Sequence, residues 1–303
     1  MIVRPGLHWL RMVFVWRGSV LRDIAPQLLL VTGFSILVTV LHGRLFAWKV
    51  PLNFVPFSLI GLTLAIFLGF RNNTSYARYW EARLLWGSLL NETRAMLRQA
   101  LTLVDPPEAA PLLAARLIAF VHALRHQLRK TDPSADFERL LSDEDRARLR
   151  PAQFKPAMLL LMAGEWVRDR RQAGQLVPAL VPAIEHPLSR LTEALGGCER
   201  IASTPIPFTY AVIIHRTIFL YSVLLPFGLI DSIGAMTPVI VAFIAYTFFA
   251  LEALAAEIEE PFGMQQNDLA LDAMSRTIES TLREMLGEAQ EPVAVDPGLY
   301  IHT

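Results

Sequence analysis

The chain has 303 residues, of which 53% are hydrophobic and only 18% are charged. Soluble proteins carry about 25% charged residues, so this composition is that of a membrane protein. The 28 basic and 28 acidic side chains balance, which excludes a strongly basic nucleic-acid-binding protein, and no nucleic acid is expected as a partner. The single cysteine excludes an internal disulfide framework and a thiolate metal cluster.

The first segment, residues 1–23, combines four arginines with tryptophan and phenylalanine side chains. It has neither the apolar core nor the small-residue cleavage site of a signal peptide, so we expect it to lie at the cytoplasmic interface of a membrane. About twenty mostly apolar residues follow within 24–46, enough at ~1.5 Å each to cross ~30 Å of hydrocarbon. A second crossing is predicted to end at residue 70, so residues 24–70 hold two transmembrane helices.

The second crossing carries two ridges of side chains spaced four residues apart, as expected on one face of a helix. Small residues at this spacing let helices approach closely in a membrane, so one ridge is predicted to pack against another helix. The neighbouring apolar ridge has two interpretations, a packed helix contact or the lining of a pore, and periodicity alone favours the first. The small-residue ridge is Gly61, Ala65 and Gly69, and the apolar ridge is Leu62, Ile66 and Phe70.

Residues 71–204 lack a comparable apolar run but show amphipathic helical patterns, so they are predicted to form an inserted cytoplasmic helical domain. The second helix is expected to continue to about Leu103, and another to run from Pro107 to the helix-ending pair Asp132-Pro133. Within a loop-like stretch, residues 131–150, Ser142 is expected to cap a helix with an acidic first turn. The last helix of this domain, beginning near residue 176, is expected to stop at Gly196-Gly197.

Two more crossings are predicted in residues 205–256, and residues 257–303 are predicted to form a cytoplasmic C-terminal segment with one helix. Basic side chains gather in the N-terminal segment and in residues 71–90, so the positive-inside rule places both termini and the helical domain in the cytoplasm. An even number of crossings agrees with this topology. The sequence therefore predicts an all-α, multi-pass membrane protein with four transmembrane helices.

No motif supports enzymatic chemistry, and no cofactor is expected. The chain lacks H-E-x-x-H, a P-loop, G-x-S-x-G and G-x-G-x-x-G. His122 and His126 lie four residues apart without a third ligand nearby, which favours a structural pair over a metal site. His215-Arg216 is expected at the inner membrane interface rather than at an intramembrane functional site. Acidic residues near the end of the fourth crossing are expected to be solvated, with an acidic cation path as the minority interpretation: Glu252, Glu257, Glu259 and Glu260.

Three passages resemble the bestrophin family, specifically its bacterial branch. They are GFRNNTSYARYWEARLLWG (69–87), ERIASTPIPFTY (199–210) and EIEEPFGMQQNDLALD (257–272), and the order of hydrophobic segments matches as well. The resemblance implies a homopentameric channel in the bacterial inner membrane, with one axial pore for chloride-type anions or monovalent cations. It places a hydrophobic neck at Leu62, Ile66 and Phe70 and a cytoplasmic aperture at Ile206.

The chain departs from the animal members of this family, which bind Ca²⁺ at a clasp formed partly by an acidic run after Pro-Phe-Gly. Here the four residues that follow Gly263 carry no carboxylate. A Ca²⁺ site takes about six to eight oxygens, several of them from carboxylates. Glu260, Asp268 and Asp272 are therefore interpreted as a degenerate clasp, no metal site is expected, and gating by Ca²⁺ is not predicted.

Two other classes of function remain open. A secondary transporter would favour internal repeats, helices broken at mid-membrane and a buried ionisable group, and the second crossing has none of these. A membrane-anchored helical scaffold would instead use its cytoplasmic domain to bind a partner. Unitary single-channel currents distinguish a channel from both alternatives.

Overall fold

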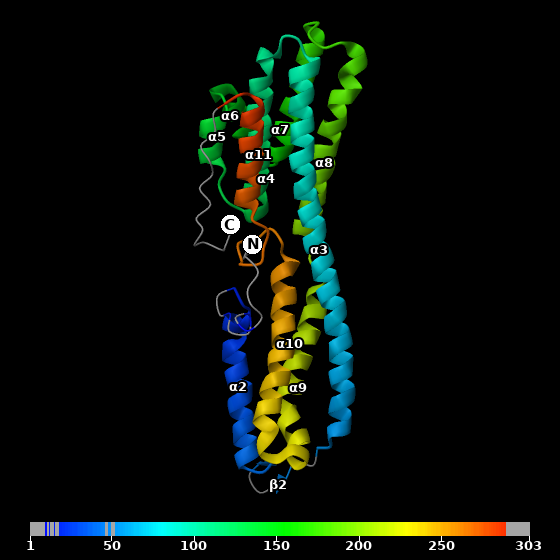
Figure 1. Ribbon diagram of the computed structural model, residues 1–303, viewed down its shortest axis with the longest axis vertical. Coiled ribbons are helices and arrows are strands. Elements are labelled where there is room, and N and C mark those ends of the chain that lie inside the picture. The colour runs from blue at the N-terminus through cyan, green and yellow to red at the C-terminus, as the bar shows by residue number, and fades with distance from the viewer. Residues whose placement is uncertain are drawn as a thin grey trace. The chain divides into compact units, whose positions relative to one another are not determined.

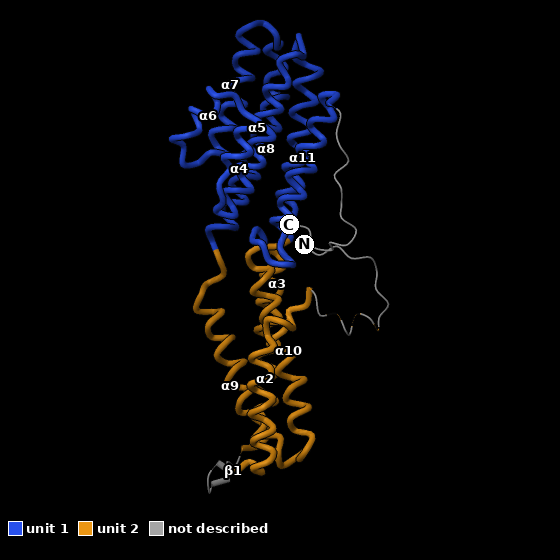
Figure 2. The backbone as a smooth tube through the Cα atoms, turned by 90° about the vertical axis from the view of Figure 1, so that its left-hand side faces the viewer, with its two compact units in different colours: residues 1–3, 80–204, 261–303 blue, residues 4–79, 205–260 orange. Residues whose placement is uncertain are grey.

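The computed structural model describes residues 10, 12, 15, 18–45, 48–49 and 52–288. The predictions for the rest of the N-terminal segment and for the end of the C-terminal segment lie outside these residues. The chain divides into two compact units (Figure 2). We call residues 4–79 with 205–260 the span unit, and residues 1–3 and 80–204 with 261–303 the bundle unit.

The span unit consists of four long helices that run side by side (Figure 1). Its core is made of aliphatic and aromatic side chains, among them Val31, Leu68 and Ile218, each at most 1% exposed. Many other large apolar side chains on the same helices stay exposed, so this unit presents an apolar surface suited to lipid or to further subunits. The helices are α2 (Leu21–Val40), the part of α3 (Phe54–Leu103) up to Tyr79, α9 (Phe208–Ile233) and α10 (Thr237–Glu259), the last two joined by η3 (Gly234–Met236).

The predicted crossings correspond to α2, the first part of α3, α9 and α10. The first of them ends at Val40, earlier than predicted, because the chain turns into a two-stranded antiparallel hairpin of β1 (Arg44–Leu45) and β2 (Trp48–Lys49). Among the described residues, four helical stretches are long and apolar enough to cross a membrane: Leu21–Val40, Phe54–Leu103, Pro107–Arg129 and Phe208–Glu259, the last of which contains both α9 and α10.

The stretch Pro107–Arg129 differs from the other three in its burial. Inside the structure 61% of its apolar window is buried, against 22% in each of the others. A helix that buries its apolar face against neighbouring helices of the same chain is typical of a bundle core rather than of a lipid-facing span. It therefore belongs with the helical domain, as the amphipathic pattern of the sequence predicts.

The bundle unit is built around α4 (Ala110–Arg129), which packs against α5, α7, α8 and α11. Its core includes Trp86, Phe120 and Met162, each at most 2% exposed. The continuous α3 reaches Leu103, as predicted. The remaining elements are η1 (Pro107–Ala109), α5 (Ser134–Leu140), α6 (Asp143–Leu149), α7 (Lys155–Gln172), η2 (Pro178–Leu180), α8 (Val181–Ser203) and α11 (Leu271–Met285).

Two predictions for the bundle unit need correction. Residues 131–150 form the short helices α5 and α6 rather than a loop, although the predicted cap is confirmed, since the Asp145 amide donates to Ser142 Oγ at 3.2 Å. The predicted stop at Gly196-Gly197 is wrong, because α8 continues to Ser203. A Cβ on Gly197 would lie 2.8 Å from Leu85 Cδ1 of α3, so this glycine permits a close helix approach inside a continuous helix.

Candidate functional site

The apolar ridge of α3 lies outside the core of its own chain. Leu62, Ile66 and Phe70 are 61%, 50% and 60% exposed, whereas Leu64 and Leu68 on the opposite side of the helix are 4% and 1% exposed. Within the described residues, the ridge is therefore not part of the packed core. Its large apolar side chains face lipid, another subunit or a pore.

The small-residue ridge divides between two surroundings. A Cβ on Gly61 would lie 2.8 Å from the hydroxyl of Tyr221 on α9, so Gly61 packs inside the subunit. Ala65 is exposed, and the Cβ position of Gly69 has no atom within 4 Å. One end of the ridge thus closes the contact between α3 and α9, and the rest is uncovered in a single chain.

Ile206, assigned to the aperture by resemblance, lies in the non-helical connection between α8 and α9 and is half-buried. It is followed by Pro207, the residue that precedes α9. Pro205 and Pro207 flank Ile206, and a helical backbone is disfavoured at the residue before a proline, which agrees with the break between α8 and α9.

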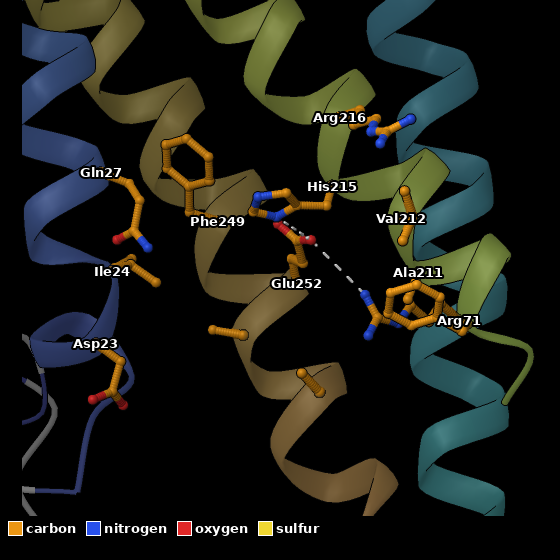
Figure 3. Close-up of a pocket in the computed structure, with 13 residues that line it drawn as sticks. Asp23, Ile24, Gln27, Arg71, Ala211, Val212, His215, Arg216, Phe249 and Glu252 are labelled. Carbon is orange, nitrogen blue, oxygen red and sulfur yellow. Dashed lines mark hydrogen bonds and ion pairs between the residues drawn. The ribbon is translucent and has the colours of Figure 1, made fainter. Parts of the chain in front are cut away.

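An ion-pair cluster follows the apolar ridge directly. Arg71 is 5% exposed, and its Nη2 lies 3.4 Å from Glu259 Oε2 while its Nη1 lies 3.9 Å from Glu252 Oε1. His215 Nδ1 lies 2.9 Å from the same Glu252 oxygen (Figure 3). The side chains of Glu252 and Glu259 are only 12% and 14% exposed, so the prediction of a solvated acidic face is wrong for these two.

Sequence reasoning missed this cluster, although a signal for it was present. Arg71 and Glu252 each adjoin a long apolar run, and a charged side chain beside such a run is costly unless it finds a partner. The same region of α3 makes two further contacts with α10. Arg78 Nε donates to the Glu259 carbonyl at 3.1 Å, and Asn72 Nδ2 donates to the Leu251 carbonyl at 3.3 Å. The end of α10 is therefore fastened to α3 just past the apolar ridge.

The residues of the degenerate clasp are engaged by protein groups or exposed. Asp268 is 2% exposed, and its Oδ2 accepts a hydrogen bond from the Gln265 amide at 2.7 Å. Both carboxylate oxygens of Asp272 contact arginines, Oδ1 at 2.9 Å from Arg125 and Oδ2 at 2.7 Å from Arg129. Glu260 is exposed at the end of α10. Among the described residues, no three His, Cys, Asp or Glu side chains are grouped as a metal site requires.

His122 and His126 bind carboxylates that belong to other helices of the bundle unit. His122 is 1% exposed, with Nε2 2.8 Å from Glu279 Oε2 of α11 and Nδ1 3.5 Å from Asp136 Oδ2 of α5. His126 Nε2 lies 3.0 Å from the same Asp136 oxygen. These contacts fasten α5 and α11 to α4, which is a structural role.

This network predicts a loss of stability in acid. Burial alone would raise the pKa of Glu279, but hydrogen bonds from His122 and Arg139 hold the pKa below its ordinary value. Burial would likewise raise the pKa of Asp136, which Arg139 and the histidines hold low. A carboxylate with a lowered folded-state pKa stabilises above its unfolded pKa and loses that contribution as pH falls. We expect the free energy of unfolding to decline below about pH 4.

The measurement is chemical unfolding of the purified protein across a pH series. Glu279→Gln removes one of the two carboxylates, so the decline in acid should be shallower than in the wild type. An equally steep decline in this variant would assign acid sensitivity to other carboxylates.

The family described as Bacterial/Fungal Bestrophin protein matches residues 1–284. The chain belongs to the bestrophin family. The three passages quoted from its sequence all lie within the matched range, so the resemblance inferred from them is confirmed.

This bestrophin is 51% identical over 295 residues to a voltage-dependent anion channel-forming protein of Ralstonia nicotianae, with 95% of each chain covered. It is 45% identical over 297 residues to the voltage-dependent anion channel-forming protein YneE of Escherichia coli K12, with 98% of each covered. Among solved structures, a bacterial bestrophin homolog from Klebsiella pneumoniae is 41% identical with a TM-score of 0.86. That match covers 88% of this chain and all of the other.

Proposed function

We propose that this bestrophin is a homopentameric channel of the bacterial inner membrane that conducts small monovalent ions along one axial pore. The observation that carries the proposal is the apolar ridge of α3, which is exposed in the single chain although the other face of the helix is buried. Three apolar rings from five copies of Leu62, Ile66 and Phe70 would form the neck. Ile206 would form a second constriction on the cytoplasmic side.

Elementary geometry supports the pentamer. A single helix cannot enclose a conduit, so a pore lined by α3 requires a closed ring of subunits. Rings of apolar side chains gate conduction by dewetting, which gives the exposed ridge a function that a lipid-facing ridge lacks. The uncovered Ala65 and Gly69 offer small side chains where an adjacent subunit would approach α3 closely.

Anions are the favoured permeant ions, because the Ralstonia and Escherichia relatives are named as anion channel-forming proteins. The relatives' names also support a channel over an enzyme. A secondary transporter is less well supported, since α3 runs without a break over 50 residues rather than being interrupted at mid-membrane. A membrane-anchored scaffold would explain the bundle unit but not the exposed apolar ridge.

The proposed topology keeps the segments predicted from the sequence. Residues 1–23, 71–204 and 257–303 would be cytoplasmic, and residues 24–70 and 205–256 would hold the two pairs of transmembrane helices. Support comes from the buried ion pairs and closed apolar core of the bundle unit, which contrast with the exposed apolar surface of the span helices. Both termini would then lie in the cytoplasm.

The deciding experiment is a reversal-potential measurement on the purified protein in planar bilayers under asymmetric potassium chloride. We expect unitary currents that reverse close to the Nernst potential of chloride. Reversal close to the Nernst potential of potassium would show that the protein is a channel for cations rather than anions. If intact oligomers give no unitary steps, the channel function is rejected, and a carrier or a scaffold becomes the better-supported function.

Gating is expected to be independent of Ca²⁺. Asp272 is held by two arginines, and the residues after Gly263 supply too few carboxylates for a Ca²⁺ site. Open probability should therefore be the same in a chelator and in micromolar Ca²⁺. Steep, reversible activation by Ca²⁺ that disappears in Asp268→Asn would show that the clasp is functional.

A further inference from the structure

A cavity of about 510 Å³ opens within the span unit, between α2, α9, α10 and Arg71 of α3 (Figure 3). Most of its wall is apolar, with Ile24 from α2, Val212 from α9 and Phe249 from α10. Charged side chains also line it. In the proposed topology the cavity lies toward the cytoplasmic ends of these helices, where the headgroups and upper acyl chains of a bilayer are found.

Arg216 is a charged group of the cavity lining that the described residues do not neutralise, and it is exposed in the single chain. It lies eight residues after Phe208, the first residue of α9, or about 12 Å along the helix at ~1.5 Å per residue. Within the part of the chain that the structure describes, Arg216 makes no ion pair, although its neighbour His215 contacts Glu252. An arginine this far into an apolar helix is costly without a counter-charge. The guanidinium of Arg216 is therefore available to an anionic group beside the apolar wall of the cavity.

Arg71 lines the same cavity but is already neutralised by two carboxylates. Its two terminal nitrogens lie near Glu252 and Glu259, and its Nε is buried out of contact with the cavity space. Asp23 also lines the cavity, from the first turn of α2, where the helix dipole favours a negative charge. Figure 3 shows Asp23 and Arg216 on opposite sides of the cavity, so Asp23 does not serve as the counter-ion.

We propose that this cavity binds a membrane phospholipid, whose phosphodiester contacts Arg216 and whose acyl chain lies along the apolar wall. Arg216 is the donor from which a phosphodiester would accept, and the apolar lining excludes a small, fully hydrated anion as the natural occupant. The site goes beyond ion conduction. The lipid site requires only that the span unit lies in a bilayer, so it is tested independently of the proposed pore.

The test measures thermal unfolding of the full-length protein in detergent with a thiol-reactive dye. Cys198 serves as the reporter, because burial raises the pKa of its thiol to about 12 and it reacts only once the bundle unit opens. Added phosphatidylglycerol or phosphatidylethanolamine should raise the unfolding temperature. Diacylglycerol, which lacks the phosphodiester, and inorganic phosphate, which lacks the acyl chains, should not.

Arg216→Gln should require roughly tenfold more phospholipid for the same shift, the loss expected for one charge-assisted hydrogen bond. Ala253→Phe places a ring in the cavity and should abolish the shift. The matched control is Ala242→Phe, about three turns earlier on the same face of α10 and outside the cavity lining, which should respond as the wild type does. Phosphorus per subunit after size-exclusion chromatography gives a second readout, which decides the matter if Ala253→Phe does not fold.

Three results would overturn the proposal. An equal response to inorganic phosphate and to the phospholipids would make this a free-anion site. Arg216→Gln could keep both its lipid response and its phosphorus content. The same variant could instead dissociate the oligomer with its lipid response intact, which would assign Arg216 to a subunit contact. None of these results bears on unitary currents, so the channel function is tested separately.

Discussion

Ile66→Ala is expected to raise single-channel conductance or open probability while the proposed pentamer remains intact. In the single chain Ile66 is 50% exposed, so truncating it opens no cavity in the subunit core. In the proposed neck, truncation widens an apolar ring and lowers the barrier to wetting. Leu62→Ala and Phe70→Ala should act in the same direction, since both side chains belong to the same exposed ridge. The measurements are unitary currents in bilayers and size-exclusion chromatography of each variant.

Leu68→Ala is the matched control on the same helix. Leu68 is 1% exposed and packs in the core of the span unit, so its truncation should cost about 2–5 kcal/mol of stability. Expression and assembly should decrease, and conductance should not increase in the oligomers that still form. If all three ridge variants give intact pentamers with unchanged currents, the ridge does not line the pore.

The positions of the helices could be predicted from the sequence wherever a single physical cause determines where a helix begins, continues or ends. The apolar runs and the unbroken pattern past Arg71 indicated both the spans and the long α3, and Ser142 indicated its own cap. The helix end predicted at Gly196-Gly197 is wrong, because glycine is found in helical segments for two structural reasons that the sequence alone does not distinguish. One is a positive φ at a helix end, and the other is a close approach between helices. In α8 the second applies, and Leu85 of α3 is the neighbour that requires it.

The candidate site could be predicted only in part, for a similar reason. The four-residue spacing of the apolar ridge is a local property, so it was visible in the sequence. The partners of Arg71 lie at Glu252 and Glu259, far along the chain, and no local pattern pairs them. The sequence around Ile206 has no periodic pattern, so the aperture was assigned there only from the resemblance to bestrophins. Pairings across long sequence separations therefore required the fold.

The largest effect on stability is expected at a buried ion pair of the bundle unit. Asp145 of α6 is 3% exposed, and its oxygens accept hydrogen bonds from Arg116 Nε and Nη2 of α4, both at 2.9 Å. Arg116 Nη1 also donates to the Met162 carbonyl of α7 at 2.9 Å. The pair thus joins three helices. Asp145→Ala leaves the guanidinium buried without its counter-charge, and we expect a loss of about 3–5 kcal/mol in the free energy of unfolding.

Asp143→Ala is the control within the same first turn of α6. The Asp143 side chain is 93% exposed and its ion pair with Arg146 lies on the surface, so its removal should change stability by roughly 1 kcal/mol or less. Chemical unfolding of the full-length variants, followed through the reactivity of Cys198, measures both effects. A combined Arg116→Met and Asp145→Leu variant should recover most of the loss, because replacing both charges leaves neither buried alone. If Asp145→Ala is no more harmful than Asp143→Ala, the guanidinium finds another partner, and the three helices do not depend on this pair.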